Sequence, residues 1–309
     1  MKFDAVFQGG GVKGIAFVGA VNCLEENGYK WNNLAGTSAG SIVATLLAAG
    51  YTGKELKEIM MDMNYAKLLK KNILNDIPVV GNVFQLVNDL GVYSSRVIEN
   101  WMFERLWEKG KTKFKDIEKE GIMLKIIAAD VTRRSILILP DDLKKYGINP
   151  GEFSIAKAVR MSCSIPFFFK PVKLEYDDKI DYIVDGGLIS NFPIWVFDSD
   201  TAPKWPTFGF KLTNDSPKND FKKNAVERKS NLISYSIDVI NTAFDRDEEV
   251  YVADKDAVRT INIPTKGVKA TDFDLSKKKT MELYHSGYNS TKAFLDGWNF
   301  GEYILRYRM

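Results

Sequence analysis

Gly36-Thr37-Ser38-Ala39-Gly40 is the stretch of sequence that decides the fold, because it places a serine between two glycines. A short strand is expected to end at Ala35, and a helix of small and apolar residues follows at 40–49. A serine on such a strand-to-helix turn is typical of an enzyme nucleophile. The usual partner is a histidine, yet His285 is the only histidine among the 309 residues. We therefore expect another group to accept the serine's proton.

The same order of strand, glycine turn and helix occurs at the start of the chain. Residues 3–8 are typical of a buried strand, three glycines end it, and 12–27 have helical spacing. Further helical stretches at 153–163 and 229–244 alternate with strand candidates. These candidates are 124–129, 135–139, 182–184, 207–212 and 258–263. Strands separated by helices predict a three-layer α/β/α fold with a mostly parallel central sheet.

The predicted organisation is one large domain. Residues 1–200 form the catalytic core, and 52–121 form a helical or lid-like insertion that is longer than a strand-to-helix connection requires. The middle of this insertion, 73–93, is expected to be an apolar loop or a short amphipathic segment. Residues 201–309 are expected to be an α/β extension that packs on the same core.

The composition excludes several classes of protein. Apolar residues make up 45%, aromatic residues 12% and charged residues 27%, as in an ordinary globular protein. A net charge of +3, with no basic run longer than three, argues against a nucleic-acid partner. The sequence does not indicate an oligomeric state.

No feature of the sequence predicts export or a membrane span. The N-terminus lacks the pattern of a classical signal peptide. The longest apolar run, 42–51, is far shorter than the ~18 residues that a spanning helix needs. Cys23 and Cys163 have neither disulfide-framework nor metal-ligand spacing and are expected to pack as small apolar side chains. We expect a cytoplasmic protein whose membrane contact, if any, is peripheral.

Gly9-Gly10-Gly11-Val12-Lys13-Gly14 fits two kinds of site. Its spacing matches a dinucleotide fingerprint, which needs an acidic residue about 20 positions further on to hold the ribose. Residues 32–35, at the end of the second strand, provide no acidic side chain. A phosphate loop is excluded because Ile15 stands where lysine is needed. A nucleotide-binding regulatory module stays open as an alternative.

An oxyanion hole explains the glycine loop better. Attack by serine on an ester moves negative charge to the carbonyl oxygen, which glycine N–H groups at a helix start can approach closely. Gly10 and Gly11 are the candidate donors. Ala39, directly after the serine, offers another N–H at the positive end of the next helix.

Asp185-Gly186-Gly187 supplies the candidate base. Asp185 ends an apolar strand candidate, and the two glycines let its carboxylate lie close to another loop. Because the carboxyl ends of parallel strands meet at one edge of a sheet, we expect Asp185 and Ser38 to meet there. Burial would raise the pKa of this carboxyl and make it a better base near neutral pH.

These motifs, with the block Arg160-Met161-Ser162-Cys163-Ser164-Ile165-Pro166, resemble the patatin-like phospholipases over about residues 3–195. The resemblance implies a lipid acyl hydrolase with Ser38 as nucleophile and Asp185 as base. It implies an oxyanion hole in the 9–14 loop, no metal and no cofactor, and an acyl lipid substrate, for which contact with a lipid surface is one option. The supporting motif residues are Gly9, Lys13, Gly14, Gly36, Gly40, Gly186 and Gly187.

Two basic residues have open roles. Lys13 either orients the glycine loop or meets a phosphate head group, and a solvated lysine at a helix start is the alternative. Arg160 is a candidate second anion contact.

An α/β-hydrolase with a Ser38–Asp185–His285 triad is the rival enzyme, because these residues occur in the required order. Two observations argue against it. Only one strand precedes the strand that leads into Ser38, whereas several do in that fold, and His285 lies in a stretch typical of a helix. A lipid-binding protein without activity is a further alternative, although every motif residue is present.

Overall fold

The computed structural model describes residues 1–62, 90–214 and 254–307, apart from 271 and 273, and also residues 235, 239 and 242. The predicted helix at 229–244 lies outside the described residues apart from those three positions. So does the predicted apolar segment at 73–93, apart from its last four residues.

The described strands form a sheet of eight and a separate pair, β3 with β6. Their bounds are β1 Lys2–Phe7, β2 Lys30–Thr37, β3 Gly91–Tyr93, β4 Leu124–Asp130, β5 Ser135–Leu139, β6 Phe167–Phe169, β7 Val172–Tyr176, β8 Lys179–Asp185, β9 Thr207–Thr213 and β10 Thr260–Pro264. The main sheet has the order β10-β9-β1-β2-β4-β8-β7, and β5 pairs with β4. The five strands from β10 to β4 are parallel, whereas β5 and β8 run antiparallel to β4. This α/β fold with a mostly parallel central sheet agrees with the prediction.

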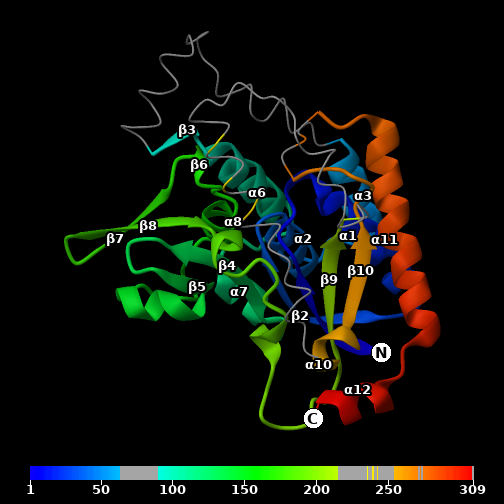
Figure 1. Ribbon diagram of the computed structural model, residues 1–309. Helices are drawn as coiled ribbons and strands as arrows, with labels where there is room; N and C mark the ends of the chain where they lie inside the picture. Colours follow the sequence, from blue (N-terminus) through cyan, green and yellow to red (C-terminus); the bar gives the residue numbers. More distant parts are fainter. Residues whose placement is uncertain are drawn as a thin grey trace.

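Helices connect these strands (Figure 1). The α-helices are α1 Ile15–Glu26, α2 Ala39–Ala48, α3 Gly53–Met61, α6 Arg96–Glu108, α7 Phe114–Glu118, α8 Ile155–Ser162, α10 Asp254–Ala257, α11 Lys277–Gly297 and α12 Phe300–Tyr307. The 3₁₀ turns are η1 Gly11–Gly14, η2 Asp141–Tyr146, η3 Gly186–Leu188 and η4 Ile194–Phe197. Within the described residues, no helix combines the length and the apolar character needed to cross a bilayer.

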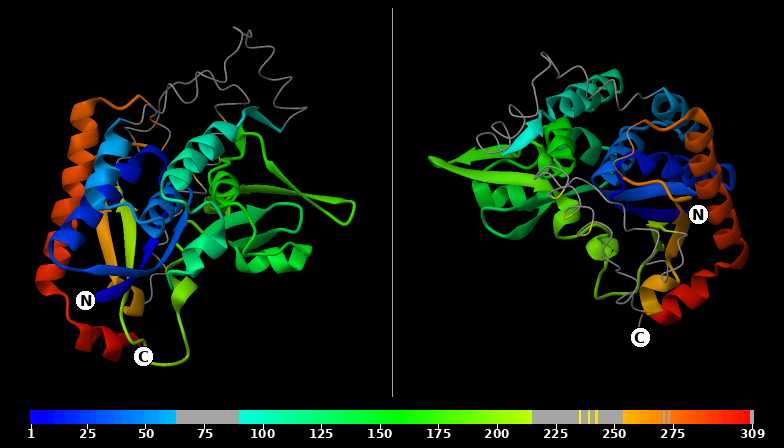
Figure 2. Two further views of the ribbon diagram at one scale, coloured as in Figure 1. Left: turned by 180° about the vertical axis from the view of Figure 1, so that it is seen from behind. Right: turned by 45° about the horizontal axis from the view of Figure 1, so that its top comes forward.

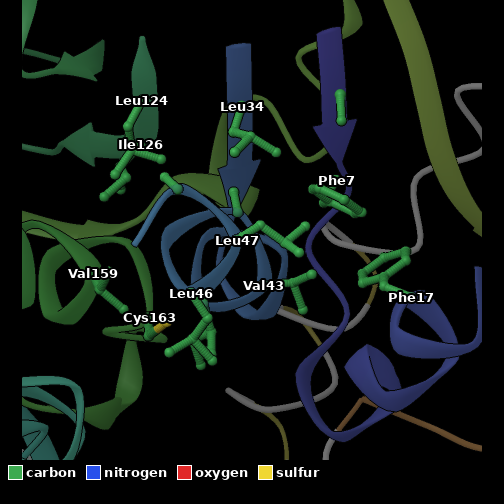
Figure 3. Close-up of a cluster of buried hydrophobic side chains, with 14 of the residues drawn as sticks. Phe7, Phe17, Leu34, Val43, Leu46, Leu47, Leu124, Ile126, Val159 and Cys163 are labelled. Carbon is green, nitrogen blue, oxygen red and sulfur yellow. The ribbon is translucent and has the colours of Figure 1, made fainter. Parts of the chain in front are cut away.

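Helix α2 lies at the centre of the core. All ten of its residues are buried, as expected for a helix that is small or apolar on every side. Figure 3 shows Leu34 of β2 and Ile126 of β4 pointing toward α2 from the sheet. It also shows Leu46 of α2 beside Val159 of α8. Contacts on two sides therefore fix the direction in which α2 leaves the sheet.

Helices α1 and α11 form an outer pair on this same face of the sheet (Figures 1 and 2). The two backbones approach closely through small residues. A Cβ at Gly287 would lie 1.8 Å from the carbonyl oxygen of Ala16, and one at Gly19 would lie 1.9 Å from that of Tyr284. Helix α11 therefore packs directly against helix α1.

The C-terminal part of the chain contributes to the same sheet. β9 lies between β1 and β10. Phe208 packs against Phe294 and Trp298 of the α11 region, while the adjacent Gly209 faces Phe192 and Ile194 on the opposite side. Residues 186–197, with η3 and η4, therefore cover part of the second face.

Three details differ from the sequence expectations. The strand predicted at 182–184 spans Lys179–Asp185 and pairs with β7, an edge strand that was not predicted. β3 and β6 were not predicted either, since each has only three residues. Most importantly, β8 is antiparallel to its neighbour β4, so Asp185 does not end a strand of the parallel set.

Candidate active site

Ser38 forms a sharp turn between β2 and α2. Its backbone has φ 52° and ψ −126°, a conformation that non-glycine residues rarely adopt. The turn is tight enough that a Cβ at Gly40 would lie 2.3 Å from the carbonyl oxygen of Phe7. The side chain of Ser38 is 5% exposed. This geometry agrees with the nucleophile turn predicted from the motif.

Two other serines hold this strained turn in place. The backbone N–H of Ser38 donates to Ser162 Oγ at 2.9 Å, and Ser162 Oγ donates to the carbonyl of Ile127 at 2.5 Å. Ser41 Oγ donates to the carbonyl of Ser38 at 2.6 Å. The turn is thus tied to α8 and β4 by tertiary hydrogen bonds.

Asp185 reaches the same place from the opposite direction. In the sheet Thr37 is paired with Ile127, and the next residue, Ala128, is paired with Asp185. Because β8 is antiparallel to β4, it enters from beyond the carboxyl edge of β2 and ends beside Ser38. The predicted meeting of Ser38 and Asp185 therefore has a different cause from the one expected.

The carboxyl group of Asp185 is fully buried. One oxygen, Oδ1, accepts the N–H of Gly187 at 2.8 Å. Burial raises the pKa of Asp185 to about 7, although its interactions with the Ser38 side chain and the Gly187 N–H lower the pKa in part. Among the described residues, Oδ2 has no well-directed hydrogen bond. The carboxylate can therefore accept a proton near neutral pH.

The glycine loop lies against Ser38. A Cβ at Gly9 would lie 3.3 Å from Ser38 Cβ, and Gly11 has φ +55° with the backbone of Ala270 beside it. The N–H of Gly9 donates to the carbonyl of Asn191 at 3.0 Å, and that of Val12 donates to Ala270 at 3.1 Å. These bonds fix the loop on both sides of Gly10 and Gly11.

The candidate donors are free within the part of the chain that the structure describes. There the N–H groups of Gly10, Gly11 and Ala39 have no acceptor. Gly14 lies close to Ala39, since a Cβ added at Gly14 would lie 3.3 Å from the Cβ of Ala39. The loop and the start of α2 thus present N–H groups without acceptors beside Ser38, and such groups are the kind of donor that an oxyanion requires.

The two basic candidates are both engaged in the protein. Lys13 is buried rather than solvated, which removes the solvated alternative. Arg160 donates to Glu99 at 2.8 Å and to Ser95 Oγ at 3.1 Å. An anion that binds Arg160 would therefore have to compete with the carboxylate of Glu99.

His285 is separated from this site. It is exposed on α11, and its ring packs edge-on against Tyr284 at 5.4 Å. Among the described residues it makes no hydrogen bond to Ser38 or Asp185. Cys163 lies near the site instead, 3.9 Å from Ser41 Oγ, but burial raises the pKa of its thiol and keeps it protonated.

Sequence reasoning missed two supporting residues. Ser162 lies in a block that the sequence singled out, but its bond to Ser38 spans 124 positions. Asn191 accepts the N–H of Gly9 with its backbone carbonyl, and because any residue type has such a carbonyl, the sequence does not indicate this role. The only available signal was the position of Ser162 within the block 160–166, and Asn191 lies outside the motifs.

Comparison with known proteins decides the family. Residues 5–198 match the family model of the patatin-like phospholipases. The chain belongs to this family. The patatin-like match ends close to the point where the glycine motifs end, and β9 and β10 follow it in the chain.

The matches to individual proteins differ in how much of the chain they cover. An uncharacterized protein of Bacillus subtilis, YqhO, is 39% identical over 97% of this chain and 100% of its own length. Probable lipid hydrolase 463L of Invertebrate iridescent virus 6 is 30% identical over 61% of each chain. The crystal structure of VipD from Legionella pneumophila aligns with a TM-score of 0.57 at 19% identity. That alignment covers 95% of this chain and 66% of VipD, and it shows a shared fold.

Proposed function

We propose that this protein hydrolyses carboxylic ester bonds of phospholipids or related acyl lipids through an acyl-enzyme on Ser38. One observation carries the proposal. The fully buried carboxyl of Asp185, whose pKa burial raises to about 7, contacts the side chain of a serine on a strained turn. Acyl transfer needs a nucleophile beside a base whose pKa is close to the working pH, and a buried carboxyl with a raised pKa is such a base.

In the first step, Ser38 Oγ attacks the ester carbonyl as its proton moves to Asp185. The new bond joins Oγ to the carbonyl carbon, and the carbonyl oxygen becomes an oxyanion. The N–H groups of Gly10, Gly11 and Ala39 are the donors that would hold this charge. When the carbon–oxygen ester bond breaks, the leaving alcohol or lysolipid takes the proton from Asp185.

The second step reverses the roles. Asp185 accepts a proton from water, which attacks the acyl-Ser38 carbonyl through the same oxyanion geometry. Collapse of this intermediate releases the fatty acid and returns the proton to Ser38 Oγ. A carboxylate alone serves as base in both steps, so the mechanism needs no histidine.

Product profiling tests this function. Wild type and Ser38→Ala are incubated with a mixture of phospholipids and acylglycerols, and the released fatty acids and lysolipids are measured by mass spectrometry. We expect fatty acid release by wild type only, and adduct formation between a fluorophosphonate and Ser38. Equal release by the folded Ser38→Ala variant would reject the assignment.

A further inference from the structure

A pocket of about 680 Å³ lies away from the glycine loop, between the start of α6, the exposed side of α8 and the chain that enters β7. Its volume is in the range of small-molecule sites. Five cationic side chains line it, against one acidic side chain, Glu175. The cations are Arg96, Lys157, Arg160, Lys170 and Lys173.

Lys157 is the central feature of this pocket. It is half-buried, and its Nζ lies 5.4 Å from the centre of the Phe153 ring. Among the described residues Lys157 forms no ion pair. Burial is the largest influence on Lys157 and lowers its pKa, whereas Glu99 and Glu175 raise the pKa and Arg160 and Arg96 lower it. Lys157 is therefore a partly desolvated cation without a directly paired carboxylate among the described residues.

Several lysines elsewhere in the described chain are paired with carboxylates. Lys109, Lys111 and Lys125 each lie next to a carboxylate. Lys113 and Lys115 share Glu152. The pocket thus gathers cationic side chains from three segments, and three of them, Arg96, Lys157 and Lys173, form no ion pair among the described residues. An anion bound there would neutralise this charge.

The pocket wall is also connected to the sheet edge that carries Ser38 and Asp185, here called the catalytic edge. Ser164 Oγ donates to the carbonyl of Arg160 at 2.7 Å and lies 2.9 Å from Ser95 Oγ. The N–H of Asp185 donates to the carbonyl of Ser164 at 2.9 Å. Ser164 therefore links Arg160 in the wall of the pocket to Asp185 through hydrogen bonds.

We propose that this pocket binds a phosphate-bearing anion with two or more negative charges, at a site separate from the acyl ester. Lys157, Arg96 and Lys173 are the cations available to it, because Arg160 is already paired with Glu99. The ligand is either a soluble phosphate ester or the head group of an anionic phospholipid. The site does not depend on the chemistry of Ser38.

Two binding assays on the full chain separate these sources. Calorimetry measures binding of inorganic pyrophosphate, and flotation measures binding to phosphatidylcholine vesicles with and without phosphatidic acid. Each assay compares wild type with Lys157→Met, which keeps the apolar stem, and with Lys173→Met, which changes an exposed residue. The matched control is Lys179→Met, an exposed lysine on the same β7–β8 hairpin outside the pocket.

We expect Lys157→Met and Lys173→Met each to weaken binding by about tenfold, the size expected for one lost charge-assisted contact. Lys179→Met should bind as wild type does. Binding of pyrophosphate identifies a soluble ligand, and binding only to vesicles that contain phosphatidic acid identifies a lipid head group. Ser38→Ala should bind normally, which separates this site from the proposed hydrolysis.

Two results would overturn the proposal. One is the absence of binding to both pyrophosphate and phosphatidic acid vesicles. The other is an equal loss in Lys179→Met, which would show that net charge rather than the pocket governs binding. Hydrolysis of a short uncharged ester serves as the folding check for each lysine variant, because none of these lysines belongs to the catalytic site.

Discussion

The catalytic edge and the α1–α11 contact are both built on glycines that approach backbone carbonyls, yet they differ in what surrounds those glycines. Gly287 lies against Ala16 in a contact between two regular helices. Gly40 lies against Phe7 beside a strained serine, a buried carboxyl and N–H groups without acceptors among the described residues. Close packing alone serves stability, whereas strain and unsatisfied polar groups together indicate chemistry.

The largest expected effect separates activity from stability at Asp185. Asp185→Asn should lower ester hydrolysis by about 10²–10⁴, the usual contribution of a general base. The same change should stabilise the fold at about pH 8, because the charged carboxylate is buried there and the amide is not charged. Initial rates and urea unfolding measure the two effects.

The sign follows from the raised pKa. Between pH 3.8, the ordinary pKa, and about 7, the folded protein keeps a proton that the unfolded chain has released. Stability therefore falls as the pH rises through this interval, by a few kcal/mol in all. Asp185→Asn should lose this dependence and gain little at about pH 4. If Asp185→Asn were less stable than wild type at both about pH 4 and about pH 8, the carboxylate of Asp185 would not be a destabilising buried charge.

A pair of glycine variants tests the comparison directly. Gly10→Ala places a Cβ 2.2 Å from the side-chain tip of Leu212, which can move, so it should disturb the oxyanion loop more than the fold. We expect kcat to fall by about 10²–10³, as for a lost oxyanion donor, with a smaller change in KM. Stability should change little.

Gly287→Ala should behave in the opposite way. Its Cβ would meet the backbone carbonyl of Ala16, which cannot move without separating the two helices. We expect a clear loss of thermal stability and a normal kcat for the protein that remains folded. If Gly10→Ala lost stability and Gly287→Ala lost turnover, the division between the two regions would be wrong.

The smallest effect is expected at the lone histidine. His285→Ala removes an exposed side chain on α11, so hydrolysis of a short acyl ester should stay close to the wild-type rate. Circular dichroism confirms the fold. A loss as large as that of Ser38→Ala would restore the Ser38–Asp185–His285 triad, since removing a triad histidine leaves only the residual catalysis of the oxyanion hole and binding.

The sequence predicted the elements whose local pattern is strong. β1, β2, α1 and α2 were found because buried runs end at glycines that the turns require. The direction of β8 was not predictable, because strand pairing is a tertiary property that alternation within one segment does not encode.

The candidate site shows the same division. Ser38 and Asp185 stand in local motifs and could be named from them. Ser162 could not, because its role is a hydrogen bond to a backbone N–H that only the packing of α8 brings near. The charge cluster around Lys157 was not predicted as a whole, although Arg160 was named as a candidate anion contact, because Arg96 joins it from a segment more than 60 residues before Lys157.

The pH dependence of Ser38 phosphonylation by a fluorophosphonate tests the central claim most directly. In this reaction Ser38 Oγ forms a bond to phosphorus, fluoride leaves, and the serine proton passes to the base, so the rate reports activation of Ser38. The account predicts a labelling rate that rises with pH and is half-maximal near pH 7, where the Asp185 carboxyl ionises. In Asp185→Asn the rate should be low and lack this step. An unchanged profile in Asp185→Asn would show that Asp185 is not the base.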